Sequence, residues 1–193
     1  MTVYKERNFM TEYDILCSIL NRHFLAQSQD IMIETKGRIK PQRVTIDGSG
    51  RNNLTWTLYK FEMDDCNFLP FFANQDGAPE GLCKFCDYVL IVEASLKTYV
   101  MLIEMKRGQS NEAEKQLYAS ETFMNYVFAT ANRLHKDFDS AQFNSSGVIL
   151  RKIKLKQNIS PKITTKMYNV DLRQNYIPYE SYGIFPIAQF LNR

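Results

Sequence analysis

Two stretches of the chain space their apolar residues every three or four positions, as an amphipathic helix does. The first follows Thr11 and Asp14, which have the spacing of a capping box, and predicts about three to four turns over residues 11–24. The second runs from Ala113 to Leu134, behind a Ser110 that can cap it. This second stretch predicts a helix of about 24 residues.

Four other stretches have the composition of β-strands. Leu54–Phe61 is rich in aromatic and β-favouring residues. Asp87–Val92 and Tyr99–Lys106 are apolar at nearly every position, which is typical of strands covered on both faces of a sheet. The residues between them, 95–98, predict a tight turn. Gly147–Lys156 predicts a further strand.

The remaining segments place short apolar pieces between turn-forming residues. Residues 28–53 predict a hairpin or loops, residues 64–82 a long loop, and the stretch near 187–191 a closing helical turn. The order of helices and strands indicates an α/β fold, with a central mixed β-sheet flanked by α-helices on its faces. Because 193 residues suffice for one hydrophobic core and no long linker interrupts them, we expect a single domain over residues 1–193.

The charge of the chain is unevenly distributed around a net value of +3. Residues 147–193 contain eight Lys and Arg and two acids, whereas residues 1–146 contain sixteen basic and nineteen acidic residues. A basic region beside a more acidic body is typical of a protein that binds a polyanion. A solvated basic strand and loop would account for the same counts, so charge alone does not decide between the two.

The hydrophobic content is that of an ordinary globular protein, with 45% apolar and 23% charged residues. No apolar run reaches the ~18 residues that a membrane span needs. The N-terminal segment is charged and lacks the apolar run of a signal peptide. We therefore expect a cytoplasmic protein with no membrane partner.

The residues best suited to chemistry lie on the two central strands. Glu104 and Lys106 are two positions apart near the end of the second strand, so their side chains are expected on the same face. Asp87 begins the preceding strand, and a tight hairpin between the strands brings it level with them. Two carboxylates and one ammonium group are thus expected to converge at one edge of a buried sheet.

Carboxylates held together beside a core repel one another, and a divalent cation removes that cost. Mg²⁺ (or Mn²⁺) suits such a site because it binds a few carboxylates together with waters and phosphate oxygens. A site of this kind can activate water and stabilise the leaving oxygen of a phosphodiester. Lys106 can orient the attacking water or neutralise the developing charge.

Asp87, Glu104 and Lys106, with the hairpin between them and the long helix that follows, resemble the D-(x)n-(D/E)-x-K motif of the PD-(D/E)XK nuclease superfamily. The resemblance covers roughly residues 11–156. It implies a restriction-endonuclease-like core and a metal-dependent nuclease. It also implies that Asp87 and Glu104 bind the metal together with the carbonyl of Met105, and that Lys106 is the catalytic lysine.

The resemblance extends to residues outside the motif itself. Gln116, on the first turns of the long helix, resembles the polar residue that many members place near the active site. The family sometimes uses an acid from the first helix, for which Glu12 and Asp14 are candidates, and Glu80 is another from the loop. The chain departs from the pattern at Cys86, which precedes Asp87 where the motif has proline.

The expected partner is nucleic acid. The resemblance favours DNA over RNA, and a role in restriction, phage defence or DNA processing fits by analogy alone. Cutting both strands of a duplex with one active site per chain favours a homodimer. A chain of 193 residues leaves little room for a separate recognition domain, so a partner protein is the other option.

Three other interpretations stay open. The chain can be a catalytically inactive nuclease-fold module that binds nucleic acid or a partner protein. Glu104 and Lys106 can instead form a structural ion pair at a sheet edge. Cys83 and Cys86 form a CxxC pair that could bind zinc with Cys66 and a histidine, but the sequence offers no second well-spaced pair.

Overall fold

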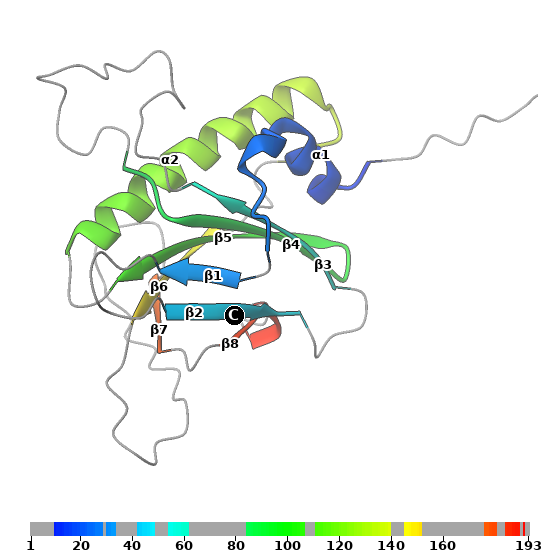
Figure 1. Cartoon of the computed structure of the whole chain (residues 1–193). Coiled ribbons are helices and arrows are strands. Elements are labelled where there is room, and N and C mark those ends of the chain that lie inside the picture. The colour runs from blue at the N-terminus through cyan, green and yellow to red at the C-terminus, as the bar shows by residue number, and fades with distance from the viewer. Residues whose placement is uncertain are drawn as a thin grey trace, which may run out of the picture.

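The structure is a computed structural model of the whole chain, and it describes residues 10–28, 30–33, 42–48, 54–61, 84–106, 111–139, 145–151, 176–180, 184–189 and 191. Across these residues the helices and strands form three layers (Figure 1). The long loop expected over residues 64–82 lies outside the described part of the chain.

The central layer is a five-stranded mixed sheet in the order β3-β4-β5-β6-β7. The first three strands are antiparallel neighbours, whereas β6 and β7 continue parallel to β5. A parallel pair needs a crossover connection, and helix α2 lies between β5 and β6 in the chain. The strands are β3 (Leu54–Lys60), β4 (Tyr88–Ala94), β5 (Lys97–Lys106), β6 (Ser145–Arg151) and β7 (Tyr176–Glu180).

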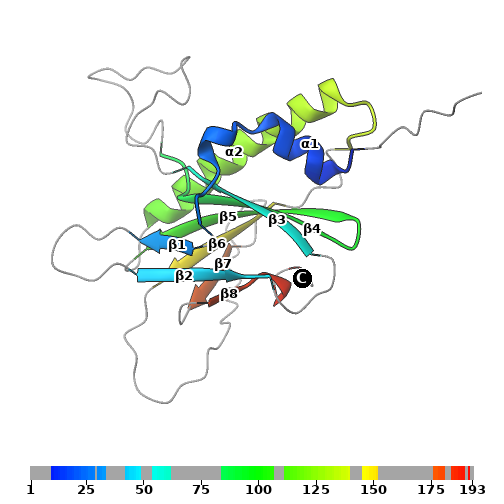
Figure 2. The same cartoon turned by 45° about the vertical axis from the view of Figure 1, so that its right-hand side comes forward.

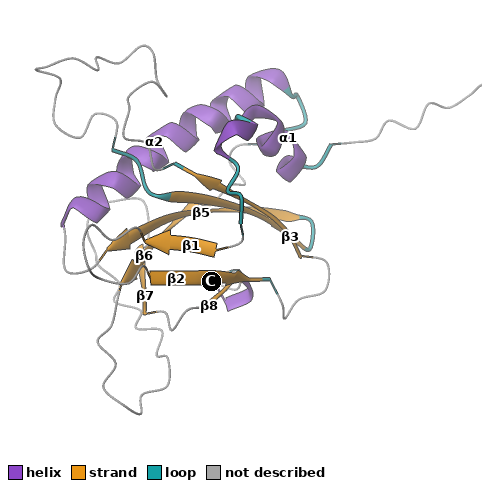
Figure 3. Cartoon of the chain, in the orientation of Figure 1, coloured by secondary structure: helices purple, strands orange, loops and turns teal. Residues whose placement is uncertain are grey.

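Both helices, α1 (Glu12–Ile19) and α2 (Asn111–Leu134), cover the same face of this sheet (Figure 2). The other face is covered by a small sheet in the order β1-β2-β8 and by the 3-10 helix η4 (Ile187–Gln189) (Figure 3). The α/β class and the mixed sheet are confirmed, but among the described residues no α-helix lies on this second face, contrary to expectation. The small sheet takes the place of a helix there, because a second sheet can bury the apolar face of the central sheet as well as a helix can. The small sheet consists of β1 (Asp30–Ile33), β2 (Gln42–Asp47) and β8 (Ile184–Pro186).

The strands β4 and β5 form the centre of the core because they are apolar on both faces. Alternate residues pack against the helices, and the intervening ones pack against the small sheet. Each such side chain contributes about 1.5–3 kcal/mol when fully buried. The helix-facing residues are Val89, Ile91, Val100 and Leu102, and those facing the small sheet are Leu90, Val92, Met101 and Ile103.

Helix α2 spans 24 residues, as the sequence predicts. Six of its buried residues recur at alternating intervals of four and three, so they form one continuous stripe along the helix, and the buried Phe128 lies next to it. A single polar residue, Ser120, interrupts the stripe and is fully buried. The stripe consists of Ala113, Leu117, Ser120, Met124, Val127 and Ala131.

Helix α1 begins as predicted but ends early. Thr11 and Asp14 form the expected capping box, in which the Asp14 amide donates to the Thr11 hydroxyl and the Thr11 amide to the Asp14 carboxylate. The helix ends at Ile19 because Leu20 has an extended backbone, so the prediction of three to four turns is wrong. The side chain of Asn21 then caps a separate 3-10 turn, η1 (Arg22–Phe24), which explains the continuing apolar spacing.

The hairpin between β4 and β5 closes more tightly than the sequence predicts. Ala94 pairs directly with Lys97, so the turn has only two central residues, Ser95 and Leu96. Their φ angles are 51° and 65°, in the left-handed region that a type I′ hairpin turn requires at both positions. Glycine and asparagine favour this conformation, whereas leucine strongly disfavours it, which is why the sequence predicts a turn here but not its two-residue length.

Replacing Ser95-Leu96 with Asn-Gly is expected to raise the free energy of unfolding by about 1 kcal/mol, because both positions adopt positive φ. The Leu96 side chain is 93% exposed, so its removal loses no packing. Denaturant unfolding of the two proteins measures the difference. Leu96→Ala is the control, since it removes the same exposed side chain but keeps a residue with a Cβ. A loss of stability in the Asn-Gly variant would contradict the turn geometry.

Candidate active site

The register of β4 and β5 places Asp87 opposite Glu104. Tyr88 pairs with Ile103, and extending the antiparallel ladder by one residue on each strand gives Asp87 and Glu104. Because the helix-facing residues of β4 and β5 alternate with those facing the small sheet, these two positions fall on the side of α2. The sequence-based prediction that the two acids lie level with each other agrees with this register.

Each of the two carboxylates accepts a hydrogen bond from the backbone of the other strand. The Asp87 amide donates to Glu104 Oε2 at 3.2 Å, and the Met105 amide donates to Asp87 Oδ2 at 2.7 Å. Bonds from an amide to an ionised oxygen are stronger than neutral ones, so this exchange fixes both side chains against the sheet. Glu104 is fully buried, including Oε1, and Asp87 is partly buried.

The pKa of the neighbouring Cys86 thiol reflects the negative charge of this pair. The pKa of Cys86 is raised to about 12, mainly by burial, and the hydrogen bond with Ser120 opposes this rise. The carboxylates of Glu104 and Asp87 also contribute to the rise, because a thiolate beside them would add a further negative charge. Cys86 Sγ is 3.2 Å from the Tyr88 carbonyl, to which it donates.

The segment before Asp87 is held by two polar side chains of α2. Gln116 Nε2 donates to the carbonyl of Phe85 at 3.2 Å. Ser120 Oγ accepts from the Cys86 amide at 2.6 Å and donates to the Gln116 carbonyl at 2.8 Å. Because Gln116 and Ser120 are four residues apart, they lie on one face of the helix. The chain therefore reaches Asp87 along a path fixed by α2.

An aromatic cluster reinforces this attachment. The ring of Phe123 on α2 packs edge-on against Phe85, with 5.7 Å between ring centroids, and against Phe61 at 5.6 Å. Phe61 follows β3, and its amide donates to the Asp87 carbonyl at 2.8 Å. Both the backbone and the ring of Phe61 thus hold the start of β4 in place.

The predicted site residues differ in how far the structure describes them. It brings Asp87, Glu104 and the Met105 amide together, and Gln116 contacts the segment that carries Asp87. Lys106 is the last residue of β5 and pairs with Arg151 of β6, but its side chain is not among those described.

The acids suggested outside the motif do not join the pair among the described residues. The Asp14 carboxylate belongs to the capping box of α1. The pKa of Glu12 is raised by its partial burial and by the negative charge of Asp139, which follows α2. Glu80 lies outside the described part of the chain, as do Cys66 and Cys83 of the zinc alternative.

Ser120 is the residue that the sequence analysis missed. It interrupts an otherwise apolar helical stripe between Leu117 and Met124, which is the one pattern that could have singled it out. A serine at such a position either bonds to its own helix or accepts a bond from a neighbouring element. Ser120 does both, because it donates to the Gln116 carbonyl and accepts from the Cys86 amide. The bond to Cys86 could not be inferred without the fold.

The described residues contain no group of three or more His, Cys, Asp or Glu side chains arranged to hold a metal ion. The Asp87–Glu104 pair contains two carboxylates, one fewer than such a group needs. Carboxylate and carbonyl oxygens are the ligands that Mg²⁺ and Mn²⁺ prefer, and Mg²⁺ retains several waters when it binds through one or two carboxylates.

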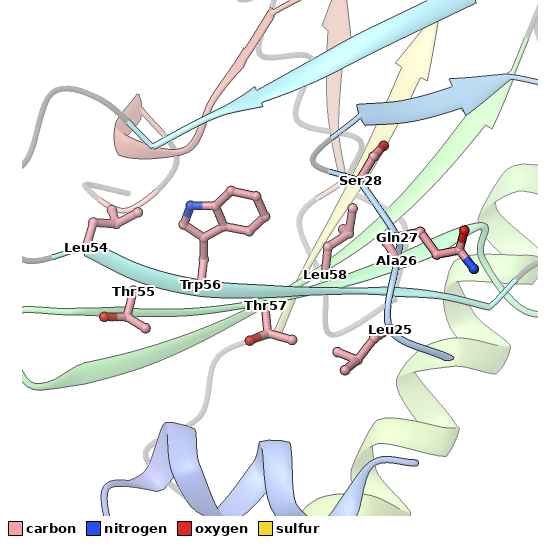
Figure 4. Close-up of a pocket in the computed structure, with 9 residues that line it drawn as sticks. All are labelled: Leu25, Ala26, Gln27, Ser28, Leu54, Thr55, Trp56, Thr57 and Leu58. Carbon is pink, nitrogen blue, oxygen red and sulfur yellow. The ribbon is translucent and has the colours of Figure 1, made fainter. Parts of the chain in front are cut away.

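A pocket of about 520 Å³ lies elsewhere, between residues 25–28 and β3 (Figure 4). Leu54, Trp56 and Leu58 rise from one side of β3, and the indole of Trp56 packs so closely on Gly48 that a Cβ there would lie 2.9 Å from Nε1. None of the residues that line this pocket belongs to the site around Asp87.

No helix among the described residues is long and apolar enough to cross a membrane. Comparison with models of protein families, with curated proteins and with solved structures gives no match to this chain.

The Cys86 thiol is expected to resist thiol reagents in the native protein between about pH 7 and 9, because it is buried beside two carboxylates and only the thiolate reacts. The measurement is the labelling rate of a variant in which the other three cysteines are serine, before and after denaturation. A variant that keeps only the partly exposed Cys17 is the control and should react in the native state. Equal native rates for the two thiols would show that Cys86 is accessible and the site is built differently.

Proposed function

We propose that this protein is a Mg²⁺-dependent nuclease that hydrolyses phosphodiester bonds, with DNA favoured over RNA as its substrate. The observation that carries the proposal is the pairing of Asp87 with Glu104 across adjacent buried strands, where backbone amides donate hydrogen bonds of 3.2 and 2.7 Å to the two carboxylates. A fold has no packing reason to bury two acids side by side, since each carboxylate costs free energy there. Such placement is a feature of functional sites.

The topology supports a restriction-endonuclease-like core. The order helix α1, antiparallel β3, β4 and β5, helix α2 and parallel β6 agrees with the order of elements that the resemblance implies. In this order the acid-bearing ends of β4 and β5 lie beside the start of α2, where Gln116 is found. Fold alone does not establish activity, so the proposal depends on the site residues.

The donor set fits a hard divalent cation. Asp87 and Glu104 each have two carboxylate oxygens, and each oxygen can accept more than one bond, so a hydrogen bond from an amide is compatible with binding a metal ion. The carbonyl of Met105 is the third proposed ligand. When bound, the ion would supply a water of lowered pKa and a positive charge beside the scissile phosphate.

The protein groups would divide the remaining tasks. Asp87 and Glu104 would orient the ion, since their side chains are held by backbone amides of the opposite strand. Lys106, two residues after Glu104, would orient the attacking water or neutralise charge in the transition state. The basic residues of the 147–193 region would attract the phosphate backbone.

The decisive experiment measures cleavage of circular DNA, linear DNA and RNA with Mg²⁺, Mn²⁺ and EDTA. Asp87→Asn and Glu104→Gln are expected to reduce cleavage by more than the roughly 10–100-fold that loss of an outer-shell partner costs. Both substitutions keep the shape and one acceptor oxygen, so they remove the charge while preserving the fold. Lys106→Met should also abolish cleavage.

Metal binding separates the roles of the three residues. Excess Mg²⁺ should raise the melting temperature of the wild type and of Lys106→Met, but not that of Asp87→Asn or Glu104→Gln. Glu93→Gln is the matched control, because Glu93 lies on β4 at the opposite end of the same hairpin. Mg²⁺ binding without cleavage of any substrate would favour the inactive nuclease-fold module. Undiminished cleavage in Glu104→Gln would overturn the proposed site.

A further inference from the structure

Ser120 occupies a place that packing alone does not explain. It is fully buried on α2, in a stripe whose other members are apolar. A buried hydroxyl needs a partner, and its own helix already supplies one in the Gln116 carbonyl, which accepts at 2.8 Å. Alanine would therefore pack equally well at this position, unless the hydroxyl also bonds to another element of the fold.

The second partner is the amide of Cys86, at 2.6 Å. Because the hydroxyl hydrogen is directed at the Gln116 carbonyl, the lone pairs of Oγ are free to face the Cys86 N–H. The bond spans 34 residues of sequence and joins the helix to the residue immediately before Asp87. Ser120 is thus a fixed acceptor for the backbone that carries the first acid.

Successive polar groups of this backbone bond first to helix α2 and then to strand β5. The Phe85 carbonyl bonds to Gln116, the Cys86 amide to Ser120 and the Asp87 amide to Glu104. A shift of the Cys86 amide would change the path of the backbone into Asp87 and so would move the two contacts that Asp87 makes with β5. Those two contacts are the ones that hold the carboxylate pair in register.

We infer that Ser120 is a positioning residue for the Asp87–Glu104 pair, which it acts on through the Cys86 amide. Its effect on catalysis rests on the proposed nuclease function, but its effect on the pair does not. Loss of the hydroxyl should loosen the acid end of the hairpin while leaving the turn end unchanged, since the turn end has its own ladder of strand pairs.

Native-state hydrogen exchange tests the inference without requiring any activity. In Ser120→Ala, the amides of Asp87 and Met105 should exchange at least about tenfold faster, whereas those near the turn of the same hairpin keep their rates. Ser120→Cys is a nearly isosteric second variant with a weak acceptor, which should behave in the same way if Ser120→Ala folds poorly.

Thr122→Ala is the matched control. Thr122 makes the same kind of bond to its own helix, to the Tyr118 carbonyl at 3.0 Å, but it is exposed. Its exchange pattern should equal that of the wild type. An unchanged rate at Asp87 and Met105 in the Ser120 variants, or a uniform increase along the whole hairpin, would overturn the positioning role.

Activity then separates this inference from the proposed function. If the wild type cleaves DNA, Ser120→Ala should lower kcat by about 10–100-fold, as loss of an outer-shell partner does, with KM for DNA unchanged. Equal kcat in wild type and Ser120→Ala would overturn the catalytic consequence. A wild type that neither cleaves nor binds Mg²⁺ would refute the proposed function, and the exchange pattern would still decide whether Ser120 positions the pair.

Discussion

Asp87 and Glu104 each accept a hydrogen bond from the backbone of the neighbouring strand, and this exchange constrains much of the fold around it. The two carboxylates repel, so they remain together only if the strands that carry them cannot move apart or slide. A slip of one residue would turn every side chain of the strand to the opposite face of the sheet. Because β4 and β5 are buried on both faces, such a slip would expose or misplace the whole core. The apolar ladder thus keeps the acids in register.

Helix α2 has two functions in this arrangement. It makes the crossover that a parallel β5–β6 pair requires, and its apolar stripe covers the central strands. The polar residues Gln116 and Ser120 on the same helix hold the backbone that leads to Asp87, and Phe123 packs against the flanking rings. The element that completes the core therefore also places the first acid, so that the geometry of the site and the packing of the helix depend on one another.

Patterns that act over short distances in sequence predicted most of the central layer. The nearly continuous apolar runs of β4 and β5 and the short connection between them were sufficient to place Asp87 near Glu104, and the helical period gave the extent of α2. The two-residue turn escaped prediction because Ser95 and Leu96 adopt a conformation that their side chains disfavour. The length of α1 was overestimated because Phe24 keeps the apolar spacing in a separate turn. The small sheet on the second face depends on β8, which pairs with β2 from the far end of the chain, and no local pattern reports that pairing.

The backbone amides that hold Asp87 and Glu104 affect how the site would bind a cation. Ligands on strands and helices are held more accurately than ligands on loops. Here oxygens of Asp87 and Glu104 are oriented by amide donors of the protein itself, so binding of an ion would involve little ordering of the side chains. The same donors compensate part of the cost of burying negative charge, since an N–H dipole directed at a carboxylate stabilises its ionised form. The ionised form is the one that a divalent cation binds. Among the contacts described, backbone amides are directed at both carboxylates, so the main chain of the two strands helps to reconcile a stable core with an acidic site.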